Sequence, residues 1–107
     1  MATYSDTQFA VINVAAAAAT LVAAQATGVK VRVVSLFLVN TTAQTLTFKS
    51  GAGGTALTGA MALGANGVLV LPYNPAGYFE TAAATLLELA ASGSTQVSGA
   101  LQWAAVS

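Results

Sequence analysis

Large apolar residues recur at every second position along much of this chain. Leu46 and Phe48 alternate with threonines and Lys49, while Leu101 and Trp103 alternate with alanines and a glutamine. This alternation is the pattern of a β-strand that buries one face and exposes the other. Turn-forming clusters of Gly, Pro, Asn and Ser interrupt it at intervals of about 10 to 15 residues, which is typical of an all-β sandwich or barrel. The strands that we predict cover residues 7–14, 19–25, 29–39, 44–50, 55–63, 67–71, 77–81, 85–91 and 97–106.

These nine ranges, about eight or nine strands, predict an all-β fold, a single-domain antiparallel β-sandwich that is jelly-roll-like. The chain has 107 residues, which suits one domain and is too short for two ordinary ones. Within that one domain we distinguish an N-terminal arm with the first strands, residues 1–26, from a β-sandwich body, residues 27–107.

The alanine-rich segment between residues 14 and 26 is where two interpretations compete. Alanine is the best helix former, so local propensity favours a helix. The segment has a poor apolar stripe, however, and an isolated helix of that length is marginal without one. We therefore predict that it is extended.

The strand predicted at residues 29–39 changes character halfway. It begins with valines that alternate with Lys30 and Arg32, so one face of its first half is expected to be exposed to solvent. From residue 34 to residue 39 it is apolar on both faces, and such a strand must be covered on both. The second cover is either another subunit or the long loops of the chain itself. The side chains that we predict to take part in self-association are Val34, Leu36 and Leu38.

A loop with two prolines follows the strand predicted at residues 67–71. Tyr73 and Tyr78 lie near its two ends. Because proline restricts the backbone and cannot donate a hydrogen bond, we expect this loop to be stiff and ordered. Exposed tyrosines on an ordered loop are suited to protein contacts. The alternative is a connecting loop whose tyrosines pack on the domain edge.

Charged residues are unusually rare. The chain has three basic and three acidic side chains and a formal net charge of zero, where about 27 charged residues would be ordinary for this length. A freely diffusing protein keeps itself dispersed with surface charge. A surface made largely of Ala, Ser, Thr, Gly, Asn and Gln suits either a protein that packs against neighbours or a very inert coat, so we expect an assembled structural part more than an enzyme.

The residue inventory excludes several kinds of chemistry. The chain has no histidine and no cysteine, so the commonest general base, the thiol nucleophile and the usual zinc ligands are missing. Three basic residues cannot neutralise several phosphates, which argues against nucleic-acid binding. The glycines at 51, 53 and 54 predict a hairpin loop, because a phosphate cradle would open a helix. We expect no enzymatic activity, no metal and no cofactor, and a rim salt bridge for Glu80 or Glu88.

The most apolar stretch, residues 9–24, raises the question of a membrane. It is shorter than the ~20 strongly apolar residues that a spanning helix needs. No basic residue precedes Lys30, whereas a signal peptide begins with a basic region. We expect no membrane segment and synthesis inside the cell.

The segment from residue 31 to residue 107 resembles small tailed-bacteriophage virion proteins that decorate or cement the capsid. The likeness covers about three quarters of the chain. It is carried by VRVVSLFLV at 31–39 with TLTFKSG at 45–51, by LTGAM at 57–61 with LVLPY at 69–73, and by GYFET at 77–81 with Leu86, Leu87, Leu89 and GALQW at 99–103. The resemblance implies a β-sandwich, often a jelly roll, that forms a homotrimer on three-fold positions of the shell and has no enzymatic activity.

The leading hypothesis is a structural protein on the outer surface of a phage capsid, made in the host cytoplasm. It would stabilise the capsid by bridging neighbouring subunits of the major capsid protein, and residues 1–26 would form a capsid-contacting arm. In this hypothesis Tyr73 and Tyr78 make loop contacts. The alternatives are a tail, fibre or head-tail adaptor component and a carbohydrate-binding β-sandwich; a small hydrolase is disfavoured by the missing histidine and cysteine.

Overall fold

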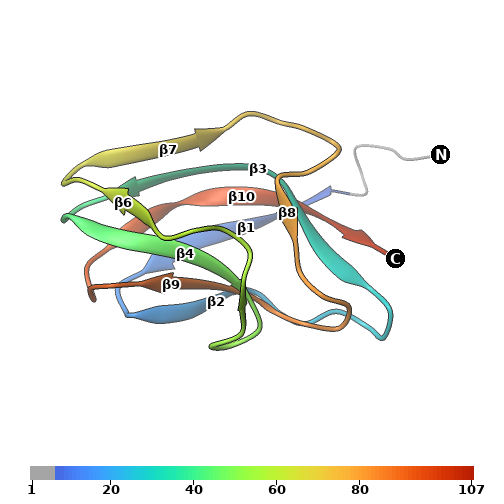
Figure 1. Ribbon diagram of the computed structural model, residues 1–107. Coiled ribbons are helices and arrows are strands. Elements are labelled where there is room, and N and C mark those ends of the chain that lie inside the picture. The colour runs from blue at the N-terminus through green and yellow to red at the C-terminus, as the bar shows by residue number, and fades with distance from the viewer. Residues whose placement is uncertain (1–6) are drawn as a thin grey trace.

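The computed structural model describes residues 7–107, and this part of the chain folds into two five-stranded sheets packed face to face (Figure 1). All strand pairs are antiparallel, which confirms the predicted all-β sandwich. The sheet that we call the β1 sheet contains, in order, β1 (Thr7–Val14), β10 (Val97–Val106), β3 (Lys30–Asn40) and β7 (Gly67–Leu71), with β8 (Phe79–Glu80) also beside β3. The β2 sheet contains β2 (Ala18–Val22), β9 (Leu87–Ala91), β4 (Gln44–Ser50) and β5 (Thr55–Ala56), with β6 (Met61–Leu63) also beside β4.

The pairing of strands is that of a jelly roll. The first four strands pair with the last strands in reverse order: β1 with β10, β2 with β9, β3 with β7 and β8, and β4 with β5 and β6. The chain therefore folds like a doubled ribbon that wraps around one core, as a jelly roll does. The structure has ten strands where nine ranges were predicted, because the strand predicted at residues 55–63 is divided into β5 and β6.

Residues 14–26 are extended and not helical, as predicted. β1 ends at Val14, and β2 continues the chain in the opposite sheet after a short bend. β1 belongs to one sheet and β2 to the other, so the first strands contribute to both layers of the sandwich. The division into an arm at residues 1–26 and a body at residues 27–107 stays a prediction. Residues 1–6, the first part of the expected arm, lie outside the described residues. None of the described residues forms a helix able to cross a membrane.

The core lies between the two sheets and consists of aliphatic side chains with two large aromatic ones. Phe48 of β4 and Trp103 of β10 are both buried, and the phenyl rings of Phe48 and Phe79 lie with their centroids 5.0 Å apart. Burying side chains of this size contributes about 1.5–3 kcal/mol each to folding. The chain has no cysteine, so packing and hydrogen bonds hold the two layers together.

A β-bulge in β3 controls which of its side chains reach this core. Gln102 of β10 pairs with Ser35, but the next residue, Trp103, pairs with Val33. Val34 is therefore an extra residue without a partner in β10. A bulge of this kind shifts the inward and outward alternation by one position.

The burial of β3 follows this shift. Before the bulge the odd-numbered residues Val31 and Val33 are buried in the core, and after it the even-numbered Leu36 and Leu38 are. Without the extra residue, one of the two pairs would face outward. The bulge lets a single long strand contribute to the core at both of its ends.

The far end of β3 is fixed by a buried amide. The Nδ2 group of Asn40 donates to the carbonyl oxygens of Thr42, Leu63 and Gly64, and its Oδ1 accepts a 2.7 Å hydrogen bond from Gln44. Asn40 is fully buried, and such groups persist because their polar atoms are satisfied. These bonds tie β3 to β4 and to the turn between β6 and β7.

Deletion of Val34 tests the role of the bulge. We expect the deletion to abolish cooperative folding, because it forces two buried apolar side chains of β3 outward. At about 1.5–3 kcal/mol for each, with packing losses added, the change removes a large part of the roughly 5–15 kcal/mol that stabilises a typical domain. Urea denaturation followed by tryptophan fluorescence measures it. Deletion of the exposed Ala52 in the β4–β5 loop is the control, and equal stability of the two deletions would contradict the argument.

Candidate functional site: an apolar outer face on one sheet

The outer side of the β1 sheet exposes large apolar side chains from three of its strands. After the bulge, β3 turns Phe37 and Val39 outward, and their exposed fractions are 55% and 40%. Phe9 is 77% exposed and lies on β1, at one edge of the sheet. The side chains that make up what we call the apolar face are Phe9, Val11, Phe37, Val39, Val68 and Val70, with Ala100 between them.

The strand register aligns these residues across the sheet. Val11 of β1 pairs with Ala100 of β10, Ala100 pairs with Phe37 of β3, and Phe37 pairs with Val70 of β7. They form one continuous row over four strands. In the neighbouring row Val39 pairs with Val68. Side chains in such rows lie about 4.5–5.5 Å apart at Cβ, so the face is continuous.

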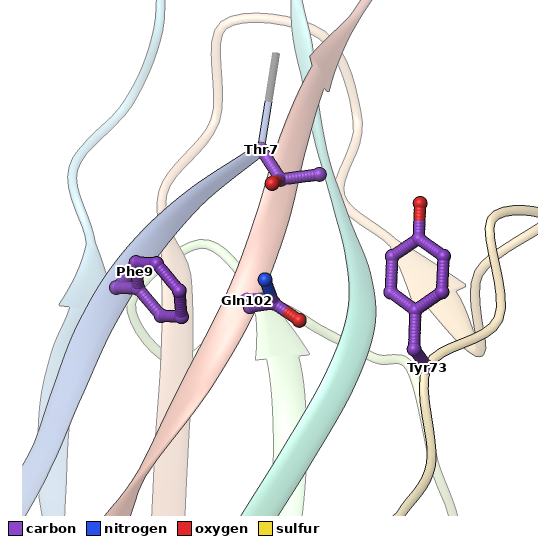
Figure 2. A pocket seen from close by; sticks show the side chains of 4 residues that line it. All are labelled: Thr7, Phe9, Tyr73 and Gln102. Carbon is purple, nitrogen blue, oxygen red and sulfur yellow. The ribbon is translucent and has the colours of Figure 1, made fainter. Parts of the chain in front are cut away.

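A hollow of about 400 Å³ lies at one end of the apolar face, lined by Thr7, Phe9, Tyr73 and Gln102. Figure 2 shows Phe9 and Tyr73 on either side of Gln102, with Thr7 above it. The Ser35 hydroxyl lies 2.8 Å from the Gln102 Oε1 atom and donates to it. The hollow thus combines two aromatic rings with neutral polar groups.

The outer side of the β2 sheet has a different character. One of its rows consists of Ala18, Ala90 and Thr47, and in another Lys49 pairs with Glu88. Phenylalanine and valine are good strand formers, but strand propensity acts on both sheets alike. Strand propensity alone therefore does not explain why large apolar side chains are exposed on the β1 sheet and not on the β2 sheet.

Three of the chain's six charged residues lie together on the β1 sheet at the same end as the hollow, because Thr7 pairs with Ala104, Ala104 with Arg32 and Arg32 with Glu80. Arg32 Nε is 3.0 Å from Glu80 Oε1, and Lys30 Nζ is 3.4 Å from Glu80 Oε2. The hydrogen bond from Arg32 is the main reason why the pKa of Glu80 is lowered from its ordinary value of 4.5. The rim salt bridge predicted for a glutamate is confirmed at Glu80, and none of the residues of the apolar face is charged.

The structure contradicts the prediction that Val34, Leu36 and Leu38 take part in self-association. All three are buried by the chain itself, with exposed fractions of 2%, 2% and 0%. Lys30 and Arg32 face outward, and strict alternation from them would place the later even-numbered residues of β3 outside as well. The bulge shifts the alternation by one position, so these residues face the core. The second face of the strand is nevertheless uncovered, and it is formed by the odd-numbered residues instead.

Tyr73 and Tyr78 are both partly exposed and lie in an ordered loop, as predicted. The Tyr78 hydroxyl donates a 2.6 Å hydrogen bond to the Pro72 carbonyl oxygen, and the Asn74 amide donates to the carbonyl oxygen of Val34. The loop closes through Gly77, whose φ of +83° suits glycine. Tyr73 borders the apolar face, and the predicted contact role of the two tyrosines stays a prediction.

The remaining candidates for chemistry are not brought together. Glu80 belongs to the β1 sheet, whereas Glu88 belongs to the β2 sheet and accepts a 3.0 Å hydrogen bond from the Gly53 amide. Residues 51–54 connect the paired strands β4 and β5, which confirms the predicted hairpin loop. Residues 7–107 contain no group of three or more acidic, histidine or cysteine side chains placed to hold a metal ion.

The outward residues of the apolar face were missed in the sequence because the strands that hold them are apolar on both sides. In β7, leucines alternate with Val68 and Val70, and both kinds of residue could have faced the core. The available signal was that β1, β3 and β7 each have this double apolar character. Strands of this kind, placed next to one another by the fold, indicate an uncovered face.

Comparison with known proteins finds no protein-family model, no curated protein and no solved structure that matches the chain.

The pairing of Glu80 with Arg32 predicts how stability changes with pH. Because the folded protein lowers the pKa of Glu80, the carboxylate adds stability above its unfolded pKa, and this stability is lost as the pH falls through the lowered value. We expect Glu80→Gln to lower the free energy of unfolding by about 1 kcal/mol or less at neutral pH, since the pair is partly exposed. Urea denaturation should show this difference vanish at a pH below the lowered pKa. A difference that persists undiminished in acid would exclude the ionic explanation.

Proposed function

We propose that this chain is a structural protein of a bacteriophage virion that decorates the outer surface of the capsid. It stabilises the shell by bridging neighbouring subunits of the major capsid protein, and it acts as a homotrimer without enzymatic activity or cofactor. The observation that carries the proposal is the apolar face, because such a surface suits a protein that works in contact with others. The scarcity of charge over the rest of the chain supports the same conclusion.

The physical basis is the removal of apolar surface from water. Each Å² of apolar area buried contributes about 25 cal/mol. An interface of standard size holds a subunit in place after the entropic cost of association is met. A decoration protein uses this gain to resist outward pressure on the shell.

The loop at residues 72–78 is the contact element that we assign to the capsid. Its internal hydrogen bonds at Tyr78 and Asn74 hold its shape, so little conformational entropy is lost when it binds. Tyr73 is 48% exposed, and tyrosine is enriched at the centres of protein interfaces.

Rebinding to phage particles tests the proposed function. Particles assembled without this chain are mixed with the purified protein, and the copies bound per particle are measured by quantitative mass spectrometry. We expect on the order of one copy for each few major capsid subunits, because decoration follows the symmetry of the shell, and greater resistance of the particles to heat. A handful of copies per particle would favour the tail, fibre or adaptor alternative, and no binding at all would refute a virion role.

A carbohydrate-binding module is the second candidate, and the hollow beside Gln102 favours it. Aromatic rings bind the apolar faces of sugars, while amide and hydroxyl groups hydrogen-bond to their oxygens. Phe9 and Tyr73 provide the rings, and Gln102 and Thr7 provide neutral polar groups.

A glycan array measures this second candidate directly. If the hollow is a sugar site, the wild-type protein binds a defined set of neutral glycans, and Tyr73→Ala lowers that binding at least tenfold because it removes one ring. Ala62→Ser, on the opposite sheet, should bind as the wild type does. If no glycan binds above background, the carbohydrate alternative is wrong.

A further inference from the structure

We infer that the apolar face is a self-association surface whose partner is the same face of a second copy of this chain. This inference does not depend on the decoration role, and it differs from the proposed homotrimer because a contact between two identical faces closes as a pair. It rests on three properties of the face: its area, its lack of charge and its relief.

The area is large for a surface that stays in water. The exposed areas of the two phenylalanines, the four valines and Tyr73 add up to on the order of 700 Å². This sum takes the whole surface of an aromatic side chain as about 200 Å². A typical monomer has a largest apolar patch of about 300–600 Å². A stable interface of standard size takes about 800 Å² from each partner, so the face is large enough to form most of one.

The lack of charge selects the kind of partner. A second identical face brings no like charges together, so no repulsion opposes the contact. A strongly charged partner would lose its hydration against a face that has no charge to pair with. The nearest ionic groups, those of Lys30, Arg32 and Glu80, already pair with one another.

The relief of the face is complementary to itself. The outward residues of β10 include Ser98 and Ala100, which are small, so β10 forms a trough between the taller side chains of β1 and β3. A hollow of about 130 Å³ in this trough is lined partly by Phe9, Phe37 and Ala100. A side chain from the ridge of one copy can enter the trough of the other, and sheets packed in this way lie about 10 Å apart.

The polar residues in the trough do not oppose the contact. Ser35 and Gln102 form a hydrogen bond with each other, so part of the cost of burying polar groups is already offset. The contact therefore has an apolar centre with few polar groups, as protein interfaces commonly have.

Light scattering coupled to gel filtration tests the inference with two matched variants. Val70→Lys places a charge in the apolar face on the edge strand β7, and Ala62→Lys places the same charge on the exposed side of the edge strand β6. We expect the wild type and Ala62→Lys to have a mass of twice 10.6 kDa, because two copies joined by the same face form a closed pair. A mass of three times 10.6 kDa would contradict the face-to-face pair and favour the proposed homotrimer. Val70→Lys should raise the dissociation concentration at least tenfold, so that it elutes as a single chain. Circular dichroism verifies that each variant is folded.

A labelling experiment gives a second measurement that leaves the face almost unchanged. The chain has no cysteine, so a single cysteine introduced by Ala100→Cys or by Ala62→Cys is unique. In the associated protein we expect the cysteine at position 100 to react with a maleimide at least tenfold more slowly than it does after dilution to single chains. The cysteine at position 62 should react equally fast in both states.

Two further outcomes would overturn the inference: a wild type that stays a single chain at all accessible concentrations, or a Val70→Lys variant that associates as the wild type does. Its failure is distinguishable from failure of the proposed function. A single-chain protein that still binds phage particles in many copies overturns self-association, including the homotrimer, but not the decoration role. An associated protein that binds no particles overturns only the decoration role.

Discussion

The β-bulge at Val34 is the constraint on which the rest of this structure depends. β3 lies inside the β1 sheet between β10 and β7 and is apolar over most of its length. The extra residue lets Val31 and Val33 enter the core from one half of the strand and Leu36 and Leu38 from the other. It therefore also decides that Phe37 and Val39 face outward. The core and the apolar face are consequences of the same shift in register.

The two outer sides of the sandwich give the molecule two surfaces with different properties. The outer side of the β2 sheet carries small residues together with Lys49 and the buried Glu88, whereas valines and phenylalanines cover much of the β1 sheet. A surface of small neutral side chains has little to attract a partner. The apolar face gains free energy when it is covered. This asymmetry is the reason for assigning the proposed contacts to the apolar face and not to the β2 sheet.

The strands could be predicted well from the sequence, because the signal for a strand is local. The predicted bounds of residues 7–14, 44–50, 67–71 and 97–106 agree with the structure. The candidate site could not be predicted to the same degree. Of the two covers considered for the second face of the strand at 29–39, the chain's own loops leave Phe37 and Val39 exposed. This face was assigned from the sequence to the even-numbered residues, whereas the odd-numbered ones form it. The hollow between Phe9 and Tyr73 combines residues more than 60 positions apart, which no local pattern reveals.

The sequence by itself determined the class of fold, the scarcity of charge and the absence of histidine and cysteine chemistry, since these follow from composition and from alternation between neighbouring residues. Only the tertiary structure decided which side of β3 meets the core. That choice arises where Ser35 pairs with Gln102, 67 residues away, and the next pair skips Val34. Such a mismatch exists only when the two strands lie side by side, so it leaves no mark on either strand alone.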